Sequence, residues 1–230
     1  MSNRGCCGHI SERTMLIKLV LLAALLGTFA KASETRVIDG DTLEVGSTKV
    51  RLFGIDAPEY GQKCSKRKSG VWPCGKEATQ FLVELIGDQQ VTCVSKGIDN
   101  YDRQIGVCSV GDLEINASMV SSGMAWAFVK YSTAYVSLEK EARKTGLGVW
   151  QAETETPWKY RSHRWGVAIQ KAPEGCPIKG NISKKGEKIY HTPWSPWYKR
   201  TKISINKGER WFCDEAEAVA AGWRSPMWGG

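Results

Sequence analysis

The sequence contains no internal repeat and no low-complexity tract, and it is poor in long apolar runs. Without a repeat, a solenoid or propeller built from recurring units is excluded. The apolar run Leu19–Ala30 is shorter than the roughly 20 residues that a membrane-spanning helix needs. We therefore expect a globular protein that has no stable membrane span once an N-terminal signal has been removed.

The N-terminal segment has the pattern of an export signal. Basic residues precede the apolar run, and residues 30–32 (Ala-Lys-Ala) have the small-x-small pattern of a signal peptidase site. These features predict a signal peptide over residues 1–32 and a secreted or periplasmic protein that begins at Ser33. Two alternatives stay open: Met15 could be the true start, and the segment could be an uncleaved membrane anchor.

Charge is unevenly distributed along the chain. Residues 33–150 carry 14 Lys and Arg against 15 Asp and Glu, whereas residues 151–230 carry 14 against 8. A basic C-terminal part suggests an anionic partner such as nucleic acid or the cell envelope, although solubility alone would also explain it. The 42% hydrophobic composition and the length of 230 residues fit one domain with a core and a small second domain.

Six of the eight cysteines follow residue 32. An even number of cysteines in an exported protein predicts disulfides, although sequence does not fix the pairing. Cys93 and Cys108 lie at the far ends of two strand-like runs, and adjacent pairs fit the local structure. The expected pairs are Cys64–Cys74, Cys93–Cys108 and Cys176–Cys213.

Short strand and helix patterns alternate over the first 150 residues. Residues 36–55 alternate apolar and polar positions, as half-buried strands do. Residues 60–75 have the composition of a basic loop, and helix patterns follow at 76–86, 115–122 and 135–145. Mixed strands with three short helices predict an α+β domain built on a small barrel.

The remaining chain divides into two parts. Residues 153–174 are expected to be a helical linker with a helix that starts at Pro157, and Trp158 and Trp165 are expected to pack against the first domain. Residues 175–225 predict a small α+β module rich in Cys, Trp and basic residues, expected to be accessory and to take no part in catalysis.

A histidine in this module raises the question of a metal site. The pattern around His191 resembles the zinc-binding module of adaptive-response DNA repair proteins, but that family's four cysteines are missing. In an exported protein, a disulfide between Cys176 and Cys213 is favoured over metal ligation by these residues.

Two stretches carry the candidate chemistry, "VIDGDTLEV" and "RLFGIDAPE". Asp-Gly alone is a signal for a tight turn between strands. With Asp56 at the end of the next strand, however, Asp41 and Asp56 could converge on a hard cation, which prefers carboxylate oxygens. Glu59 would then be near enough to handle a water molecule.

Two arginines accompany these carboxylates. Arg51 and Arg103 offer planar forks that suit phosphate oxygens. Each part also has a structural interpretation: "DAPE" could be a strand-ending turn, Arg51 a surface residue, and Arg103 an ion-pair partner of Asp102. The combination, in this order and spacing, favours a site.

The combination resembles the staphylococcal nuclease (thermonuclease) family. The resemblance runs from about Thr35 to Trp150, through "VIDGDT", "RLFGIDAPE", "YDRQIG", "VSSGMAWAF" and "GLGVW". It implies a five-stranded OB-fold β-barrel with three helices over residues 33–152. It also implies calcium-dependent hydrolysis of phosphodiester bonds in DNA, RNA or both.

The resemblance assigns roles by position. Asp41, Asp56 and the backbone carbonyl of Ala57 would hold calcium, and Glu59 would be the general base. Ala57 stands where the family commonly has threonine, but a carbonyl contact does not depend on the side chain.

The substrate contacts are implied in the same way. Arg51 and Arg103 would be catalytic residues that neutralise the charge of the phosphate. Tyr101 and Tyr131 would line the nucleotide pocket. Asn100 stands where the family's best-known member has lysine, which removes one phosphate contact.

The sequence therefore predicts an exported, monomeric, calcium-dependent nuclease. One alternative is a catalytically inactive OB-fold protein that binds nucleic acid, and another is an envelope-binding protein that acts through its basic, Trp-rich C-terminal part. Both leave the set of carboxylates and arginines unexplained.

Overall fold

The computed structural model describes residues 1–2 and 34–227. The predicted signal peptide, except for its first two residues, and the alternative start at Met15 lie outside the described residues. Within the described part of the chain, no helix is long and apolar enough to cross a membrane.

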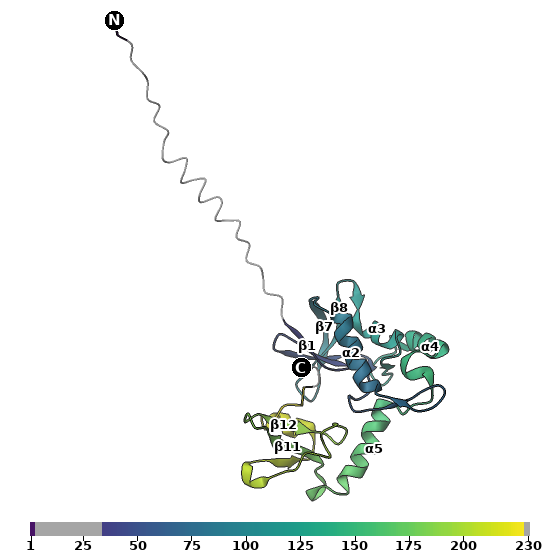
Figure 1. Ribbon diagram of the computed structural model, residues 1–230, viewed down its shortest axis with the longest axis vertical. Coiled ribbons are helices and arrows are strands. Elements are labelled where there is room, and N and C mark those ends of the chain that lie inside the picture. The colour runs from purple at the N-terminus through teal and green to yellow at the C-terminus, as the bar shows by residue number, and fades with distance from the viewer. Residues whose placement is uncertain (3–33, 228–230) are drawn as a thin grey trace. The chain divides into compact units, whose positions relative to one another are not determined.

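A six-stranded sheet forms the base of the N-terminal domain (Figure 1). The strand order is β1-β2-β3-β8-β7, and the short strand β9 pairs with β8. All neighbours are antiparallel except β3 and β8, which are parallel. The strands are β1 (Thr35–Asp39), β2 (Thr42–Val45), β3 (Thr48–Leu52), β7 (Val91–Ile98), β8 (Gln104–Val110) and β9 (Leu113–Glu114).

Three helices belong to this domain: α2 (Cys74–Ile86), α3 (Ile115–Ser121) and α4 (Val136–Thr145). The helix α2 packs on β1 and α3 packs on β8, whereas α4 packs on α3. Each begins or ends within two residues of the range that the sequence predicted. Their apolar faces and the inner faces of the strands share one core, in which Leu43, Val50, Leu52, Leu82 and Met119 are at most 1% exposed. The predicted α+β class is therefore confirmed.

Closure of the sheet into a five-stranded barrel is not detected. The described strands at the two ends of the sheet, β1 and β7, have no backbone pairing with each other. A separate two-stranded ribbon pairs β4 (Ile55–Asp56) with β10 (Trp126–Ala127). This ribbon fixes the backbone at Asp56, which is fully buried.

The basic loop predicted at residues 60–75 contains a small hairpin of β5 (Cys64–Ser65) and β6 (Val71–Trp72). The Cys64–Cys74 disulfide ties this hairpin to the first residue of α2. The strands were missed in the sequence because they are two residues long and are held by the disulfide, not by an alternating pattern.

A short 3-10 turn (Gly148–Gln151) ends the nuclease domain, and the C-terminal part begins with α5 (Pro157–Ile169). The helix that the sequence predicted at Pro157 is confirmed. Trp158 of α5 stacks on Phe128, with 5.5 Å between the ring centroids. Trp165 instead contacts Trp194 of the following module at 6.2 Å, so the expectation that Trp165 packs against the first domain was wrong.

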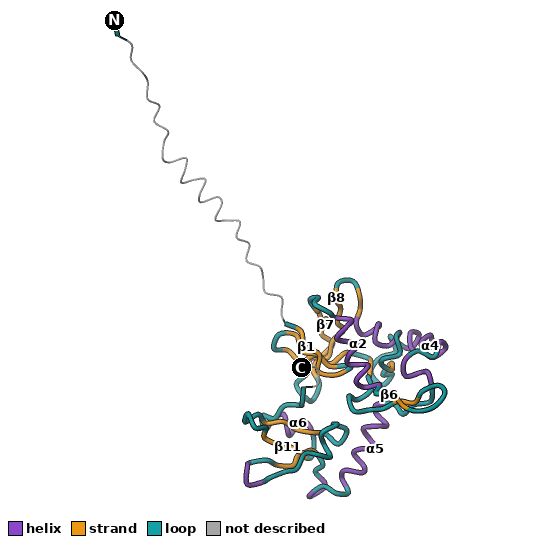
Figure 2. The backbone as a smooth tube through the Cα atoms, in the orientation of Figure 1, coloured by secondary structure: helices purple, strands orange, loops and turns teal. Residues whose placement is uncertain are grey.

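A three-stranded sheet and one helix make up the last module (Figure 2). The strand order is β12-β11-β13, with α6 packed beside the sheet. Its small core holds Ile178, Tyr190, Phe212, Ala218 and Trp223. The elements are β11 (Ile178–Ile182), β12 (Lys188–His191), β13 (Arg210–Phe212), α6 (Glu215–Ala220) and the 3-10 turns Pro173–Gly175 and Ile205–Lys207.

All three predicted disulfides are present. Cys93 and Cys108 face each other directly across β7 and β8. Cys176 and Cys213 join the segment before β11 to the residue after β13. A module with so few buried side chains needs such a covalent link to remain folded.

We predict that replacing both Cys176 and Cys213 by serine lowers the free energy of unfolding of the module by about 3–4 kcal/mol, because the bridge closes a loop over a separation of 37 residues. Urea unfolding followed by tryptophan fluorescence measures the change. The double serine variant at Cys93 and Cys108 is the comparison, since its bridge lies in the first domain. An unchanged unfolding midpoint in the C-terminal variant would show that the small core suffices alone.

Candidate active site

The turn between β1 and β2 places the first carboxylates. The register of the two strands shifts between Val37 and Asp39, and the Asp41 N–H donates to Asp39 Oδ1 at 3.1 Å. A Cβ on Gly40 would lie 2.8 Å from the Ala57 Cβ, so the absence of a side chain lets this turn approach the neighbouring strand end. The Asp-Gly pair therefore forms a tight turn and also directs Asp41 inward.

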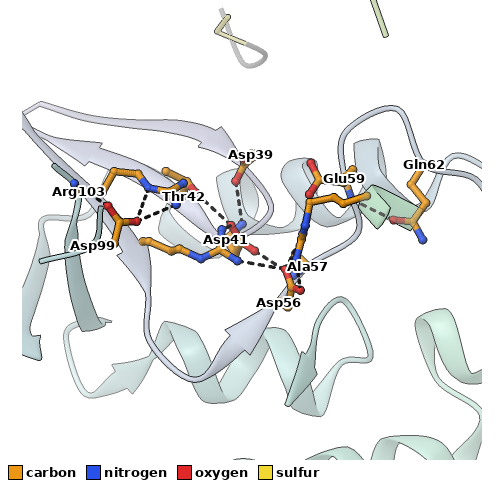
Figure 3. A network of polar contacts seen from close by, with 11 residues as sticks. Asp39, Asp41, Thr42, Asp56, Ala57, Glu59, Gln62, Asp99 and Arg103 are labelled. Atoms are coloured by element: carbon orange, nitrogen blue, oxygen red, sulfur yellow. Dashed lines mark hydrogen bonds and ion pairs between the residues drawn. The ribbon is translucent and has the colours of Figure 1, made fainter. Parts of the chain in front are cut away.

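Asp41 and Asp56 meet at Arg51, which lies on β3. The two guanidinium nitrogens of Arg51 donate to Asp41 Oδ1 at 2.9 Å and to Asp56 Oδ1 at 3.1 Å. The Ala57 N–H donates to the other oxygen of Asp41 at 3.0 Å. Figure 3 shows Asp41 at the middle of this network, next to Asp56 and Ala57. The predicted convergence of the two strand ends is thus present.

Glu59 follows on the same strand exit. Its backbone N–H donates to the side-chain oxygen of Gln62 at 3.2 Å. A Cβ added to Gly75 would lie only 1.8 Å from the Glu59 carbonyl oxygen. The start of α2 therefore packs directly on the Glu59 backbone and holds it beside the two aspartates.

Arg161 is the site residue that sequence reasoning missed. It lies on α5, yet its guanidinium donates to both oxygens of Asp56, at 3.0 and 2.7 Å, and to Glu59 Oε1 at 2.6 Å. The side chains of Asp56 and Glu59 are 0% and 18% exposed, so these ion pairs are shielded from water. In the sequence, "KYRSHRW" is a basic helix segment with no feature that separates Arg161 from its neighbours.

Arg103 lies farther along the same cleft. It forms an ion pair with Asp99 at 2.8 Å, not with Asp102 as the structural interpretation of the sequence had it. Asp102 instead has a positive φ of 58° in the turn between β7 and β8. That turn brings Asp99 back onto Arg103, and the Arg103 guanidinium also lies over the ring of Tyr101, 5.2 Å from its centroid.

Most of the site residues that the sequence singled out line one cleft of about 780 Å³, but Asp56, which is fully buried, is not among the lining residues. Asp41, Ala57 and Glu59 line it together with the two exposed tyrosines, Tyr101 and Tyr131, which are 36% and 62% exposed. The C-terminal part contributes to the same cleft through Arg161, Trp165, Trp194, Glu215 and Trp223. This lining was not expected from the sequence, which treated residues 175–225 as an accessory module.

Comparison with known proteins identifies the family of the domain that contains most of these residues. Residues 49–152 match the family model described as staphylococcal nuclease homologue. Micrococcal nuclease of Shigella flexneri is 37% identical over 144 residues, which cover 55% of this chain and 77% of that protein. The chain belongs to the staphylococcal nuclease family.

Other relatives of the nuclease domain carry different descriptions. An uncharacterized endonuclease of Haemophilus influenzae is 32% identical over 152 residues, which cover 61% of this chain and 80% of that protein. The succinoglycan biosynthesis protein ExoI of Rhizobium meliloti is 35% identical over 159 residues, covering 64% and 81%. A second family model, ArfC, matches residues 156–225, which include α5 and Arg161.

Burial and neighbouring charges shift the pKa values of the carboxylates in this nuclease-family site. Burial raises the pKa of Glu59 to about 8, aided by Asp39 and Asp41 and opposed by Arg161. Burial, together with the charge of Asp41, raises the pKa of Asp39 to about 7.

The two aspartates at Arg51 respond in opposite directions. Burial acts to raise the pKa of Asp41, but Arg51 and the Ala57 N–H together hold it below its ordinary value. Burial raises the pKa of Asp56 despite the opposing effect of Arg161 and Arg51. One of the two carboxylates is therefore firmly ionised at neutral pH.

The donor atoms fit the hard cation that the family implies. The oxygens of Asp41, Asp56 and Glu59 are the ligand type that calcium prefers. Among residues 34–227, however, no three His, Cys, Asp or Glu side chains are grouped as closely as a metal cage requires. The guanidinium of Arg161 bridges Asp56 and Glu59, so a cationic group already occupies the position between these two carboxylates. The donor atoms therefore suit a bound cation, and in this structure the positively charged guanidinium of Arg161 takes the place of one.

We predict that Gly75→Ala destabilises the protein by about 1–3 kcal/mol or more, because the added methyl group must displace the Glu59 backbone. Helix propensity alone would favour alanine by up to about 1 kcal/mol. Gly166→Ala, in α5, is the matched control: its Cβ meets nothing within 4 Å. Thermal melting of both variants measures the difference. If both substitutions raise the melting temperature, the contact between α2 and Glu59 does not constrain the site.

Proposed function

We propose that this protein is an exported, calcium-dependent nuclease that hydrolyses phosphodiester bonds in DNA, RNA or both. The observation that carries the proposal is that Asp41 and Asp56 share the guanidinium of Arg51, while Glu59, which is joined to Asp56 through Arg161, lines the same cleft as Asp41 and Arg51. Membership of the nuclease family and the description of a relative as a micrococcal nuclease support the same activity.

In this proposal Asp41, Asp56 and the Ala57 carbonyl hold a calcium ion. When bound, the ion offsets negative charge on the phosphate and orients a water molecule. Because Asp41 is fixed by Arg51 and by the Ala57 N–H, its carboxylate is positioned before any ligand arrives. Such preorganisation means that little has to be rearranged during the reaction.

Glu59 is proposed as the general base that takes a proton from the attacking water. A base is most effective when its pKa lies near the working pH, and burial moves the pKa of Glu59 toward neutrality. The N–H contact with Gln62 and the packing of Gly75 fix the backbone from which the carboxylate reaches into the cleft.

Arg51 and Arg103 are proposed to bind the phosphate oxygens. A guanidinium has five N–H donors, so Arg51 keeps free donors while it is paired with two aspartates, and Arg103 does so while it is paired with one. Negative charge that builds on the phosphate in the transition state is stabilised by such fixed donors more than the ground state is. Tyr101 and Tyr131 offer rings on which a base can stack at the rim of the cleft.

Export is supported by the three disulfides, which persist in oxidising compartments and are rare in reducing ones. The protein is proposed to act as a monomer. The alternative of an inactive nucleic-acid-binding protein predicts binding without cleavage, and activity measurements separate the two.

Digestion of plasmid DNA and of RNA tests the activity itself. With calcium, the wild-type protein is expected to cleave at least one of the two, and an excess of chelator is expected to stop it. Binding without cleavage of either substrate would favour the inactive OB-fold alternative.

We predict that Glu59→Gln lowers kcat for phosphodiester hydrolysis by about 10²–10⁴-fold, because it removes the proton acceptor and leaves the shape of the side chain. Glu141→Gln is the control, since that glutamate lies on α4 with a side chain that is 68% exposed. Circular dichroism on the same preparations checks the fold. Turnover of the Glu59 variant near that of the control would exclude the general-base role.

We predict that kcat/KM of the wild type rises with increasing pH, and that the apparent pKa of this rise lies at or below about 8. The base works in its ionised form, and the ionised fraction increases as the pH rises through the pKa of Glu59, which bound calcium lowers from about 8. The profile is measured at saturating calcium, and the Glu59→Gln variant should lose the rising limb. The same limb in both proteins would assign the titration to another group.

A further inference from the structure

Arg161 holds the two carboxylates in the manner of a bound cation. Its two terminal nitrogens contact both oxygens of Asp56, and one of them also contacts Glu59. Asp56 Oδ1 accepts a further bond from Arg51, so both oxygens of Asp56 carry cationic partners. Within the described part of the chain, Arg161 is the ion-pair partner of Glu59.

A divalent ion cannot share this position with the guanidinium. Calcium binds carboxylate oxygens at about 2.3–2.6 Å, and the Arg161 guanidinium already lies 2.7 Å from Asp56, so the two cations would occupy the same space. Two positive groups on the same oxygens in a shielded site would repel each other strongly. Binding of the ion by Asp56 therefore requires that the Arg161 side chain leave.

The helix that carries Arg161 is held in place by other contacts. Trp158 stacks on Phe128, and the Gln62 side chain donates to the Glu155 carbonyl at 2.7 Å just before α5. Neither contact involves Arg161. The long side chain can thus move away from the carboxylates while α5 stays docked on the nuclease domain.

We propose that Arg161 and the divalent cation compete for Asp56, so that the C-terminal part of the chain sets the cation affinity of the nuclease domain. This inference rests on the cation site of the proposed function, but not on hydrolysis. Arg161 keeps the carboxylates neutralised until the ion enters, and each bound ion displaces one guanidinium. Arg161 lies in the part that matches ArfC and outside the part that matches the nuclease family.

Calcium affinity measured by isothermal titration calorimetry tests this competition on the exported chain with its disulfides intact. Arg161→Gln removes the competitor and should bind calcium about 5- to 150-fold more tightly than the wild type, the usual range for coupling between two ligands. Arg161→Lys keeps the charge but loses the planar fork, so its affinity should lie between the two.

Arg164→Gln is the matched control. Arg164 lies one turn along the same helix and donates to the Tyr160 hydroxyl at 3.0 Å, so the variant loses the same charge without touching the carboxylates. Its calcium affinity should equal that of the wild type. The calcium-induced rise in melting temperature should also be larger for Arg161→Gln than for Arg164→Gln, because binding to the folded state stabilises it.

An affinity of Arg161→Gln that is equal to or weaker than that of Arg164→Gln would overturn the competition. If Arg161→Gln does not fold, Arg161→Lys decides, and an affinity no higher than that of the wild type would overturn the proposal. Hydrolysis is measured separately: tighter calcium binding by the Arg161 variant in a protein that cleaves no phosphodiester would keep the competition and reject the proposed function. If the protein cleaves phosphodiesters but the Arg161 variant has unchanged calcium affinity, the proposed function is kept and the competition is rejected.

Discussion

The carboxylates of the candidate site lie close together and are largely shielded from water, and ion pairs with two arginines stabilise this arrangement. Asp56 is fully buried, and it is held by Arg51 from the sheet and Arg161 from a distant helix. Burying ionised groups costs several kcal/mol for each ion unless they are paired, and removal of one partner typically costs about 3–5 kcal/mol. The position of every other group in the cleft depends on this balance of charge, because an unpaired carboxylate would turn toward solvent or take up a proton.

The fold supplies this balance through close backbone approaches. The turn at Gly40 comes within contact of Ala57, and Gly75 lets the start of α2 rest on the Glu59 carbonyl. These contacts fix the backbone from which the carboxylate side chains extend. The ion pairs with the arginines fix the positions of the carboxylate oxygens. The network also joins the two family matches, since Arg161 belongs to the C-terminal part and its partners to the nuclease domain.

Local patterns in the sequence were enough to predict much of the fold and the meeting of two of the carboxylates. The three helices of the nuclease domain, the helix at Pro157 and all three disulfides follow from periodicity, glycine and proline positions and cysteine spacing. Asp41 and Asp56 could be placed together because both follow strand patterns. Arg161 could not be placed, because it contacts residues about 100 positions earlier and nothing in its helix pattern indicates which face meets the cleft. The ion-pair partner of Arg103 could not be read from the sequence either: the structural alternative named Asp102, whereas Arg103 pairs with Asp99.

The central claim is that Asp41 and Asp56 form a cation site from which Arg161 is displaced. Diffraction from crystals soaked with a lanthanide ion that substitutes for calcium tests this most directly, because the ion is located by its anomalous signal. The account predicts a single strong peak within about 2.3–2.6 Å of oxygens of Asp41 and Asp56, with the Arg161 guanidinium withdrawn from Asp56. A peak elsewhere in the cleft, or a bound ion with the Arg161 contacts to Asp56 unchanged, would contradict it.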